Sequence, residues 1–173
     1  MAVTQQSSAH AELAFSRHDH DKCAATALAE AEAHAARAGL RMTPVRRRAL
    51  EILLEAHRAL GAYEVLDRLA AEGFGRQPPV AYRALDFLVA NGLAHRIQRL
   101  NAYVACLHPA RAHAPVFLIC QSCNAVAEAP GARVRAALEA GAAEVGFVVD
   151  RANVEAVGLC PTCRAAPPSG ARD

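Results

Sequence analysis

Four of the six cysteines form two C-x-x-C pairs, Cys120-Gln-Ser-Cys123 and Cys160-Pro-Thr-Cys163. Each pair can place two thiolates on one tight turn, and two such turns complete a tetrahedral Zn²⁺ site. Because four thiolates leave no open coordination position, the predicted site is structural and not catalytic. The 36 residues between the pairs leave room for a strand, a helix and a second strand that fold back on themselves.

Other uses of a C-x-x-C pair fit the sequence less well. A redox motif of the thioredoxin type needs one pair in a βαβ setting, whereas this chain has two pairs. A zinc deaminase needs an H-x-E motif upstream and a proline before the first cysteine, but here Pro161 lies between the cysteines. A zinc-bound thiol oxidoreductase stays open as an alternative function, and it would require an exposed cysteine of low pKa.

A second group of possible ligands surrounds Cys106. His95, His108 and His113 lie near it in the sequence, and Glu128 follows the first cysteine pair. One thiolate with imidazoles and a carboxylate suits Zn²⁺. Ligands drawn from both sides of a hinge suit a reversible metal sensor, because coordination is complete only in one orientation of the two halves. The alternative is that these are scattered surface histidines, which are common.

The N-terminal half predicts helices followed by a small hairpin. Helices are expected at 24–38, after the N-cap and N1 pair Thr43-Pro44, at 62–72, and from Pro78-Pro79 to Asn91-Gly92. Short strands are expected at 95–100 and 102–106, joined at Asn101. This order is typical of a winged helix-turn-helix.

The C-terminal half predicts a small α+β unit. Strands are expected at 116–120, 125–129, 147–150 and 153–157, with a helix at 133–145. Such a unit buries little surface, so we expect a metal, a partner subunit or both to stabilise it. The expected domains are a disordered tail (1–22), a winged-helix domain (23–106), a hinge (107–114), a dimerisation and zinc-binding domain (115–164) and a second tail (165–173).

Charge is concentrated in the middle of the chain. The formal net charge is +2, but residues 37–111 hold twelve arginines and six acids, for a net charge of +6. A basic segment of this kind predicts a polyanionic partner such as double-stranded DNA. The near-absence of lysine is explained by the composition of GC-rich genes, but that composition does not explain why the arginines cluster.

Several classes of protein are excluded by composition. The mean hydropathy is +0.08 and no apolar run approaches the roughly 18 residues that a membrane span needs. The N-terminus has no secretory signal pattern, so we expect a cytoplasmic protein. No nucleophile and base are arranged for catalysis, so we expect neither an enzyme nor a small-molecule substrate.

The motifs together resemble the ferric uptake regulator family of metal-dependent repressors. Residues 78–88, P-P-V-A-Y-R-A-L-D-F-L, are similar to the family's recognition-helix motif P-T-V-Y-R-x-L-x-x-L, and residues 40–46 resemble its R-x-T-P-Q-R motif. Residues 113–123 resemble the stretch in which a histidine precedes the first C-x-x-C. The departures are Val45 for glutamine, Ala81 for valine and Asn124 for glycine. The resemblance covers about residues 25–163.

The resemblance implies the zinc uptake branch of that family. Iron and peroxide sensors usually carry several histidines before the first C-x-x-C, whereas this chain has only His113 there. Carried over residue by residue, the regulatory zinc ligands of the branch are His95, Cys106, His113 and Glu128, with His108 as a possible competitor of His113. Sensing of iron, manganese or peroxide by the same fold is the alternative function.

The resemblance also implies how the protein works. Tyr82 and Arg83 would contact bases in the major groove, whereas in the alternative Tyr82 packs inward and Arg83 pairs with Asp86. Arg46 and Arg47, with the adjacent Arg48, would contact phosphate or else lie on a solvated helix face. A homodimer with one structural and one regulatory zinc per subunit would then bind palindromic operators and repress zinc-uptake genes.

Overall fold

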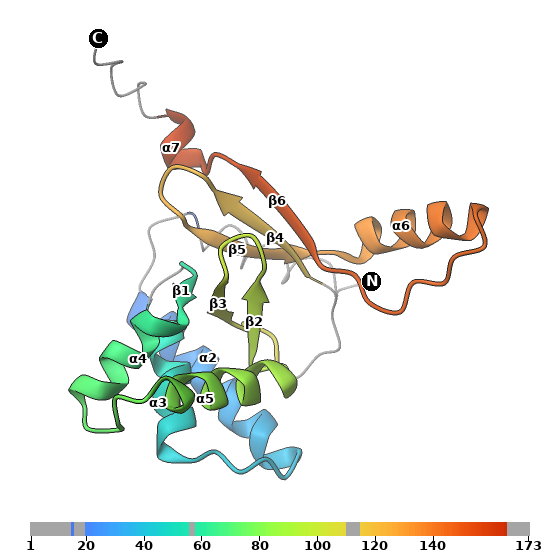
Figure 1. The fold of residues 1–173 in the computed structure, drawn as a ribbon. Helices are drawn as coiled ribbons and strands as arrows, with labels where there is room; N and C mark the ends of the chain where they lie inside the picture. The colour runs from blue at the N-terminus through green and yellow to red at the C-terminus, as the bar shows by residue number, and fades with distance from the viewer. Residues whose placement is uncertain (1–14, 16–19, 56–57, 110–114, 166–173) are drawn as a thin grey trace. The chain divides into compact units, whose positions relative to one another are not determined.

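The computed structural model describes residue 15 and residues 20–55, 58–109 and 115–165. These residues form two compact units that separate between Ala112 and His113, inside the segment 107–114 (Figure 1). Residues 20–109 are called the N-terminal unit here, and residues 115–165 the C-terminal unit. Each is described by itself.

Four helices make up most of the N-terminal unit, and they follow the helices expected from the sequence. They are α2 (His20–Arg37), α3 (Pro44–Leu54), α4 (Ala62–Ala71) and α5 (Pro78–Ala90). Thr43 is the N-cap of α3 and Pro44 its first residue, as predicted, although the Thr43 side chain makes no capping hydrogen bond. Gly73 and Gly92 follow the ends of α4 and α5 with φ of +84° and +66°, which glycine adopts without strain.

The start of α2 corrects the predicted N-terminal tail. Disorder was expected over residues 1–22, but α2 already begins at His20. The polar residues before Cys23 lack the hydrophobic period that indicates a helix, so the pattern does not reveal this first turn. Thr26 Oγ1 donates a hydrogen bond of 2.9 Å to the Lys22 carbonyl within this first part of the helix.

The core of the N-terminal unit is made by the inward faces of its helices. α3 packs against both α4 and α5, and α2 packs against α3. Leucines dominate the centre, and Leu50, Leu69, Leu85 and Leu88 are fully buried. The spacing of Leu85 and Leu88 leaves the opposite face of α5 exposed to solvent.

A three-stranded antiparallel sheet completes the N-terminal unit. Its strands are β1 (Leu60–Gly61), β2 (Ala94–Ile97) and β3 (Ala102–Ala105), in the order β1-β3-β2. β2 and β3 are the expected hairpin, which turns through Asn101 with φ of +46°. β1 was not expected, because two residues are too few to show the alternating pattern of a strand.

The C-terminal unit is a second three-stranded sheet with two helices. The strands are β4 (Pro115–Cys120), β5 (Val126–Pro130) and β6 (Val154–Gly158), and the helices are α6 (Ala132–Glu144) and α7 (Pro161–Ala165). The order is β5-β4-β6, with β4 antiparallel to β5 and parallel to β6. α6 lies in the connection from β5 to β6 (Figure 1).

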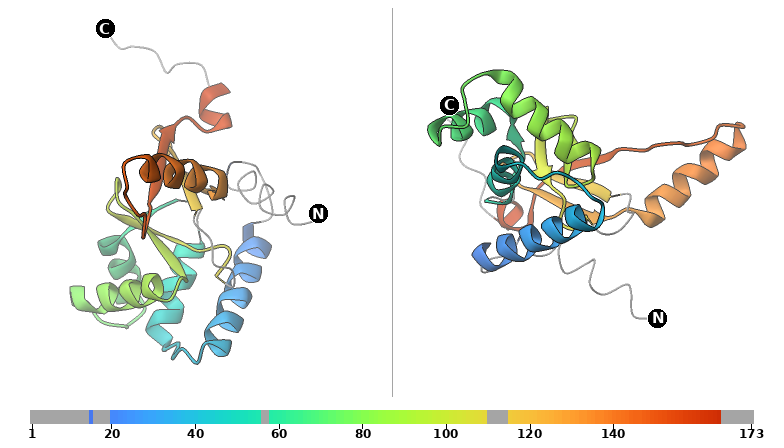
Figure 2. Two further views of the ribbon diagram at one scale, coloured as in Figure 1. Left: turned by 90° about the vertical axis from the view of Figure 1, so that its right-hand side faces the viewer. Right: turned by 90° about the horizontal axis from the view of Figure 1, so that it is seen from below.

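The segment 147–150 is not a strand, although its apolar residues predicted one. Phe147 is 65% exposed and Val148 is 86% exposed, so no sheet face buries them in the chain itself. Among its described residues α6 has no buried side chain either, and Figures 1 and 2 show this helix projecting away from the sheet of its own unit. No helix in the described part of the chain is both long and apolar enough to span a membrane.

Candidate metal centres and DNA-binding surface

The parallel pairing of β4 and β6 brings the two cysteine pairs together. Both strands run toward the same edge of the sheet, and Cys120 at the end of β4 pairs with Gly158 at the end of β6. The first cysteine turn follows Cys120, and the second begins two residues after Gly158. The Gln121 N–H donates a 2.9 Å hydrogen bond to the Gly158 carbonyl and fixes the two turns to each other.

The four sulfur atoms form a compact cluster. The Sγ atoms of Cys120, Cys123, Cys160 and Cys163 all lie within 4.8 Å of one another, and those of Cys123 and Cys160 are 3.8 Å apart. A tetrahedral Zn²⁺ with Zn–S bonds of about 2.3 Å places its sulfurs about 3.8 Å apart. The donor set therefore fits a structural zinc ion, as the spacing of the cysteines predicts.

Backbone amides around the cluster are directed at the sulfur atoms. The Cys160 N–H donates to Cys120 Sγ, and the Cys163 N–H donates to Cys160 Sγ, each at 3.4 Å. Asn124, which stands where the family often has glycine, takes a left-handed conformation with φ of +58°, and its N–H donates to the Cys120 carbonyl at 2.9 Å. Such amide donors stabilise thiolates and thereby favour metal binding.

The thiols of the cluster differ in acidity. Burial alone would raise the pKa of Cys120, but the N–H groups of Cys160, Cys123 and Ser122 outweigh it and lower that pKa to about 6. At Cys123 the Ala125 N–H favours the thiolate, but burial and the hydrogen bonds with the neighbouring thiols raise its pKa to about 12. One thiolate is thus available at neutral pH, while a neighbour keeps its proton until a cation is bound.

Two of the predicted regulatory ligands lie together within the N-terminal unit. A ring nitrogen of His95, on β2, lies within 4.8 Å of Cys106 Sγ, just after β3. The Cys106 N–H donates a 3.0 Å hydrogen bond to the Leu93 carbonyl, which extends the hairpin pairing and fixes the buried thiol. The His108 N–H donates to Cys106 Sγ at 3.4 Å. An imidazole and a thiolate at this separation fit part of a zinc site.

Of the other two predicted regulatory ligands, the structure describes only one. Glu128 is half-buried on β5, opposite Phe117 of β4, and belongs to the C-terminal unit. His113 lies outside the described residues.

The outer face of α5 carries the predicted base-reading residues. Tyr82 is 40% exposed, and Arg83, Asp86 and Ala90 are exposed with it on the face opposite the buried leucines. Within the described part of the chain, Arg83 forms no ion pair with Asp86 or with another carboxylate. This is the arrangement expected of a helix that reads DNA, and the inward packing considered for Tyr82 is not observed.

An exposed aromatic residue at the start of α4 was not singled out from the sequence. Tyr63 is 62% exposed, although it belongs to a helix whose other large side chains, Val65, Leu66 and Leu69, are buried. The sequence does contain a sign of this exposure, because Tyr63 falls outside the helical spacing of the buried residues Val65, Leu66 and Leu69. A large exposed aromatic side chain of this kind is a candidate contact for a binding partner.

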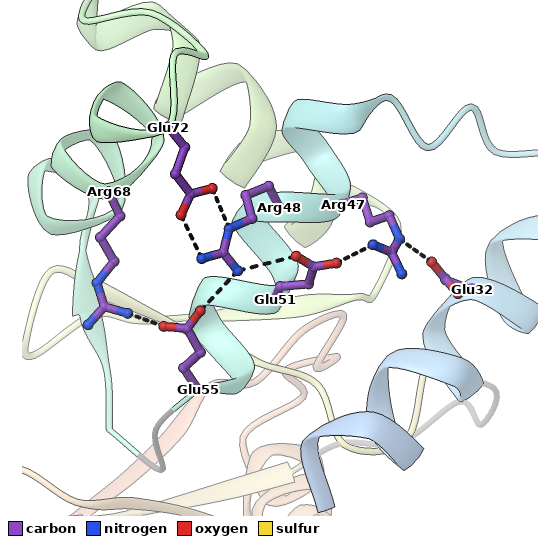
Figure 3. Close-up of polar contacts among 7 residues, drawn as sticks. All are labelled: Glu32, Arg47, Arg48, Glu51, Glu55, Arg68 and Glu72. Atoms are coloured by element: carbon purple, nitrogen blue, oxygen red, sulfur yellow. Dashed lines mark hydrogen bonds and ion pairs between the residues drawn. The ribbon is translucent and has the colours of Figure 1, made fainter. Parts of the chain in front are cut away.

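The consecutive arginines at the start of α3 have different surroundings (Figure 3). Arg47 bridges Glu32 of α2 and Glu51 of its own helix. Arg48 forms two hydrogen bonds to Glu72, of 2.6 and 2.7 Å, and also pairs with Glu51 and Glu55. These contacts join α3 to α2 and to the end of α4.

Arg46 contacts an aromatic ring instead. Its guanidinium carbon lies 3.6 Å from the centroid of the Phe87 ring on α5, and its NH1 group donates a 2.7 Å hydrogen bond to the Arg41 carbonyl. The sequence did not indicate this contact, because Arg46 and Phe87 are distant in the chain and belong to different helices.

Known proteins that are similar to this chain include several zinc uptake regulators. The zinc uptake regulation protein of Escherichia coli is 36% identical over 137 residues, which are 79% of this chain and 80% of that protein. A solved structure of a zinc uptake regulator complexed with zinc and DNA matches with a TM-score of 0.76 and 34% identity, over 82% of this chain and 95% of that one. The holo form of XcZur matches with a TM-score of 0.71 and 37% identity, over 86% of this chain and the whole of that one.

No family model matches the chain. The likeness to these relatives nevertheless covers 79–86% of the chain, which is more than either unit alone. The chain belongs to the zinc uptake regulator branch of the ferric uptake regulator family.

Proposed function

We propose that this protein is a cytoplasmic zinc-responsive repressor that binds the operators of zinc-uptake genes as a zinc-loaded homodimer. The observation that carries the proposal is the match, at a TM-score of 0.76, to a zinc uptake regulator complexed with zinc and DNA. The predicted regulatory ligands, including His95 and Cys106, would supply the zinc response, and the exposed face of α5 would supply the DNA contacts. The proposed activity is binding and not catalysis.

Two zinc sites per subunit are proposed, with different roles. Cys120, Cys123, Cys160 and Cys163 would hold a permanent ion that stabilises the C-terminal unit. The regulatory ion would be held by His95 and Cys106 of the N-terminal unit together with His113 and Glu128. A mixed set of nitrogen, sulfur and oxygen ligands suits Zn²⁺, which supplies a positive charge and a tetrahedral geometry that no side chain provides.

The proposed regulatory site would couple zinc concentration to DNA affinity. His95 and Cys106 lie at the base of the β2–β3 hairpin, whereas Glu128 belongs to the C-terminal unit. Side chains from both units can coordinate the same ion only in one relative orientation of those units. Zinc would therefore select the orientation in which two recognition helices fit one palindrome, and by linkage DNA would raise the affinity for zinc equally.

Dimerisation is proposed through the C-terminal unit. Its surface exposes Val134 and Leu138 on one stripe of α6, followed by Val145, Phe147 and Val148. Contiguous exposed apolar residues of this kind mark an interaction surface. A second copy of the chain is the proposed occupant because the DNA-bound function needs two recognition helices in fixed spacing.

On the DNA side, Tyr82 and Arg83 would read bases in the major groove and Arg46 would contact phosphate. Arg47, the other phosphate contact expected from the sequence, is paired with Glu32 and Glu51 and is not included in the proposal. Arginine can bind the O6 and N7 atoms of guanine with two hydrogen bonds, and tyrosine can contact the methyl group of thymine. The exposure of both α5 side chains supports the first assignment.

The proposal is tested by measuring DNA binding with and without zinc. Duplexes are first selected from a random library by the zinc-loaded protein, and their affinity is then measured at a free zinc concentration set by a buffer. Zinc-dependent affinity is expected, and equal affinity at all zinc concentrations contradicts the proposal. Manganese and ferrous iron serve as controls, because a response to either metal in preference to zinc would indicate the alternative sensor.

Cys106→Ser separates the two zinc sites. This variant is expected to keep one zinc per subunit and its dimeric state but to lose zinc-dependent binding to the selected duplex. Cys23→Ser is the matched control, because Cys23 lies on α2 and outside both proposed sites. Unchanged zinc-dependent binding by Cys106→Ser would remove this cysteine from the regulatory site.

A further inference from the structure

Three consecutive arginines occupy the beginning of α3, where a helix favours negative charge. The first turn of α3 contains no acidic residue, and Arg46, Arg47 and Arg48 follow Pro44 closely. The partial positive charge at the N-terminus of a helix repels cations within the first turn. Such a departure from a local rule indicates that these residues are kept for tertiary contacts or for function.

Carboxylates compensate two of the three charges. Arg47 pairs with Glu32 and Glu51, and Arg48 pairs with Glu51, Glu55 and Glu72. Figure 3 shows these pairs as one network that links the first three helices of the unit. The two arginines therefore serve the packing of the helices.

Arg46 differs because it has no carboxylate partner among the residues that the structure describes. Its charge is met by the face of the Phe87 ring, at 3.6 Å, and by the Arg41 carbonyl, at 2.7 Å. Both contacts leave the net positive charge in place. The side chain is only half-buried, and its guanidinium has further N–H donors besides the NH1 group that binds the Arg41 carbonyl.

The position of Phe87 places this cation beside the base-reading residues. Phe87 lies on α5 one helical turn after Arg83, so the two side chains share a face of the helix. Because Phe87 is half-buried, Arg46 is thus held at the flank of α5, on the side of the helix that carries Arg83.

We propose that Arg46, stacked on Phe87, is a prebuilt phosphate contact of the DNA-binding surface, and that Phe87 is the residue that positions it. This inference rests on the proposed DNA-binding function and narrows it: Arg46 contacts DNA, whereas Arg47 and Arg48 hold the helices together. A free arginine loses side-chain entropy when it binds phosphate, but a planar guanidinium already fixed on a ring and a carbonyl has lost most of it beforehand.

The test is a double-mutant cycle of Arg46→Ala and Phe87→Leu, with zinc-loaded full-length protein and a selected duplex. Arg46→Ala is expected to weaken binding at least about tenfold and to reduce the salt slope by about 0.9 per subunit. Phe87→Leu keeps the charge and an apolar side chain but removes the ring face, so it should weaken binding roughly threefold. In the Arg46→Ala background, Phe87→Leu should have no further effect.

Two controls accompany the cycle. Phe74→Leu makes the same change at a half-buried phenylalanine of the same core and should leave the affinity unchanged. Arg47→Ala removes the neighbouring charge and should leave the salt slope close to that of the wild type. The stacking itself is observed without DNA as an upfield ring-current shift of the Arg46 Nε–H resonance, which Phe87→Leu should abolish.

The outcomes separate the two proposals. If no duplex is bound in a zinc-dependent way, the proposed function fails. If binding is zinc-dependent but Phe87→Leu weakens it equally in both backgrounds, or if Arg46→Ala leaves the salt slope unchanged, the Arg46 contact is wrong and the proposed function stands.

Discussion

At the scale of residues, neighbouring side chains of one type have different physical roles because their surroundings differ. Arg48 lies within reach of three carboxylates, and its two hydrogen bonds to Glu72 lower the pKa of that carboxyl below its usual value. Arg83, on the exposed face of α5, has no carboxylate partner among the described residues. The first contributes to the stability of the fold, and the second is available to a ligand.

This contrast predicts opposite phenotypes for two alanine variants. Arg48→Ala should lower the free energy of unfolding by on the order of 1 kcal/mol, because three partly exposed carboxylates lose their partner, and it should leave the DNA affinity nearly unchanged. Arg83→Ala should leave stability unchanged and cost about 1–3 kcal/mol of binding to the selected duplex, with relaxed specificity at one base pair. Urea titration and fluorescence anisotropy measure the two quantities. Loss of stability in Arg83→Ala would contradict the assignment.

The acidity of the cluster thiols predicts how zinc affinity depends on pH. The pKa values of Cys123 and Cys163 are raised above the usual thiol value, so both must lose a proton when zinc binds. The apparent affinity should then fall as the pH is lowered from 8, by a factor of about ten per pH unit for each proton that the cluster releases, and so at least about a hundredfold per pH unit. Below about pH 6 the Cys120 thiolate is protonated as well, and the dependence should steepen. Competition with a chelator at several pH values measures this slope, and an affinity independent of pH would exclude thiolate ligation.

At the scale of elements, the helix α5 joins the core to the DNA-binding surface. Its inner residues Leu85 and Leu88 are fully buried, while Tyr82 and Arg83 on the outside are exposed. The orientation of the outer side chains therefore depends on how tightly the inner ones pack against α3 and α4.

Leu88→Ala tests this dependence. The substitution leaves a cavity in a packed core, so the free energy of unfolding should fall by about 2–5 kcal/mol. DNA affinity should fall with it as the helix loses its fixed position. Leu28→Ala is a suitable control, since Leu28 is only partly buried against the same core and should cost less. Equal losses at the two sites in denaturant titrations would show that α5 is not held by its inner face.

At the scale of the whole molecule, the C-terminal unit carries an apolar surface that its own described residues do not bury. α6 has no buried residue in the described structure, and its exposed Val134 and Leu138 continue into the exposed Val145 and Phe147. Burial of this surface in a homodimer would supply hydrophobic stabilisation that the unit lacks alone.

Leu138→Glu should therefore convert the dimer to a monomer, because it places a charge in the proposed interface. Ala136→Glu introduces the same side chain on a different face of α6 and should leave the dimer intact. Sedimentation velocity of the zinc-loaded proteins distinguishes the two. A dimeric Leu138→Glu variant would place the interface elsewhere.

Removal of zinc should proceed in two steps. A mild chelator should take one ion per subunit and abolish binding to the selected duplex, while the dimer and its fold persist. A stronger chelator or acid should remove the second ion and destabilise the C-terminal unit, because the two cysteine turns then lose the metal–sulfur bonds that tie them together. Metal analysis after each step gives the number of zinc ions per subunit, and thermal unfolding in parallel measures the loss of stability. Release of both ions together would contradict the division into structural and regulatory sites.

Much of the organisation follows from the sequence because its signals are local. The Thr43-Pro44 pair marks the start of α3, the glycines after α4 and α5 mark their ends, and Asn101 and Asn124 take the left-handed conformations that their turns require. The C-x-x-C spacing likewise defines each half of a zinc site within four residues. These features depend on neighbours along the chain, so no tertiary information is needed to find them.

Other features depend on contacts between distant segments, and only the tertiary structure decides them. The parallel pairing of β4 with β6 places the two cysteine turns at one edge, and the packing of α3 on α5 places Arg46 over Phe87. The apolar run 147–150 was wrongly expected to be a strand, because hydrophobicity alone does not say whether a partner buries it within the chain or outside it. The sequence by itself determined which residues can bind zinc or DNA. The fold decided which of three adjacent arginines lies without a carboxylate partner among the described residues, because ion pairs between helices depend on tertiary packing.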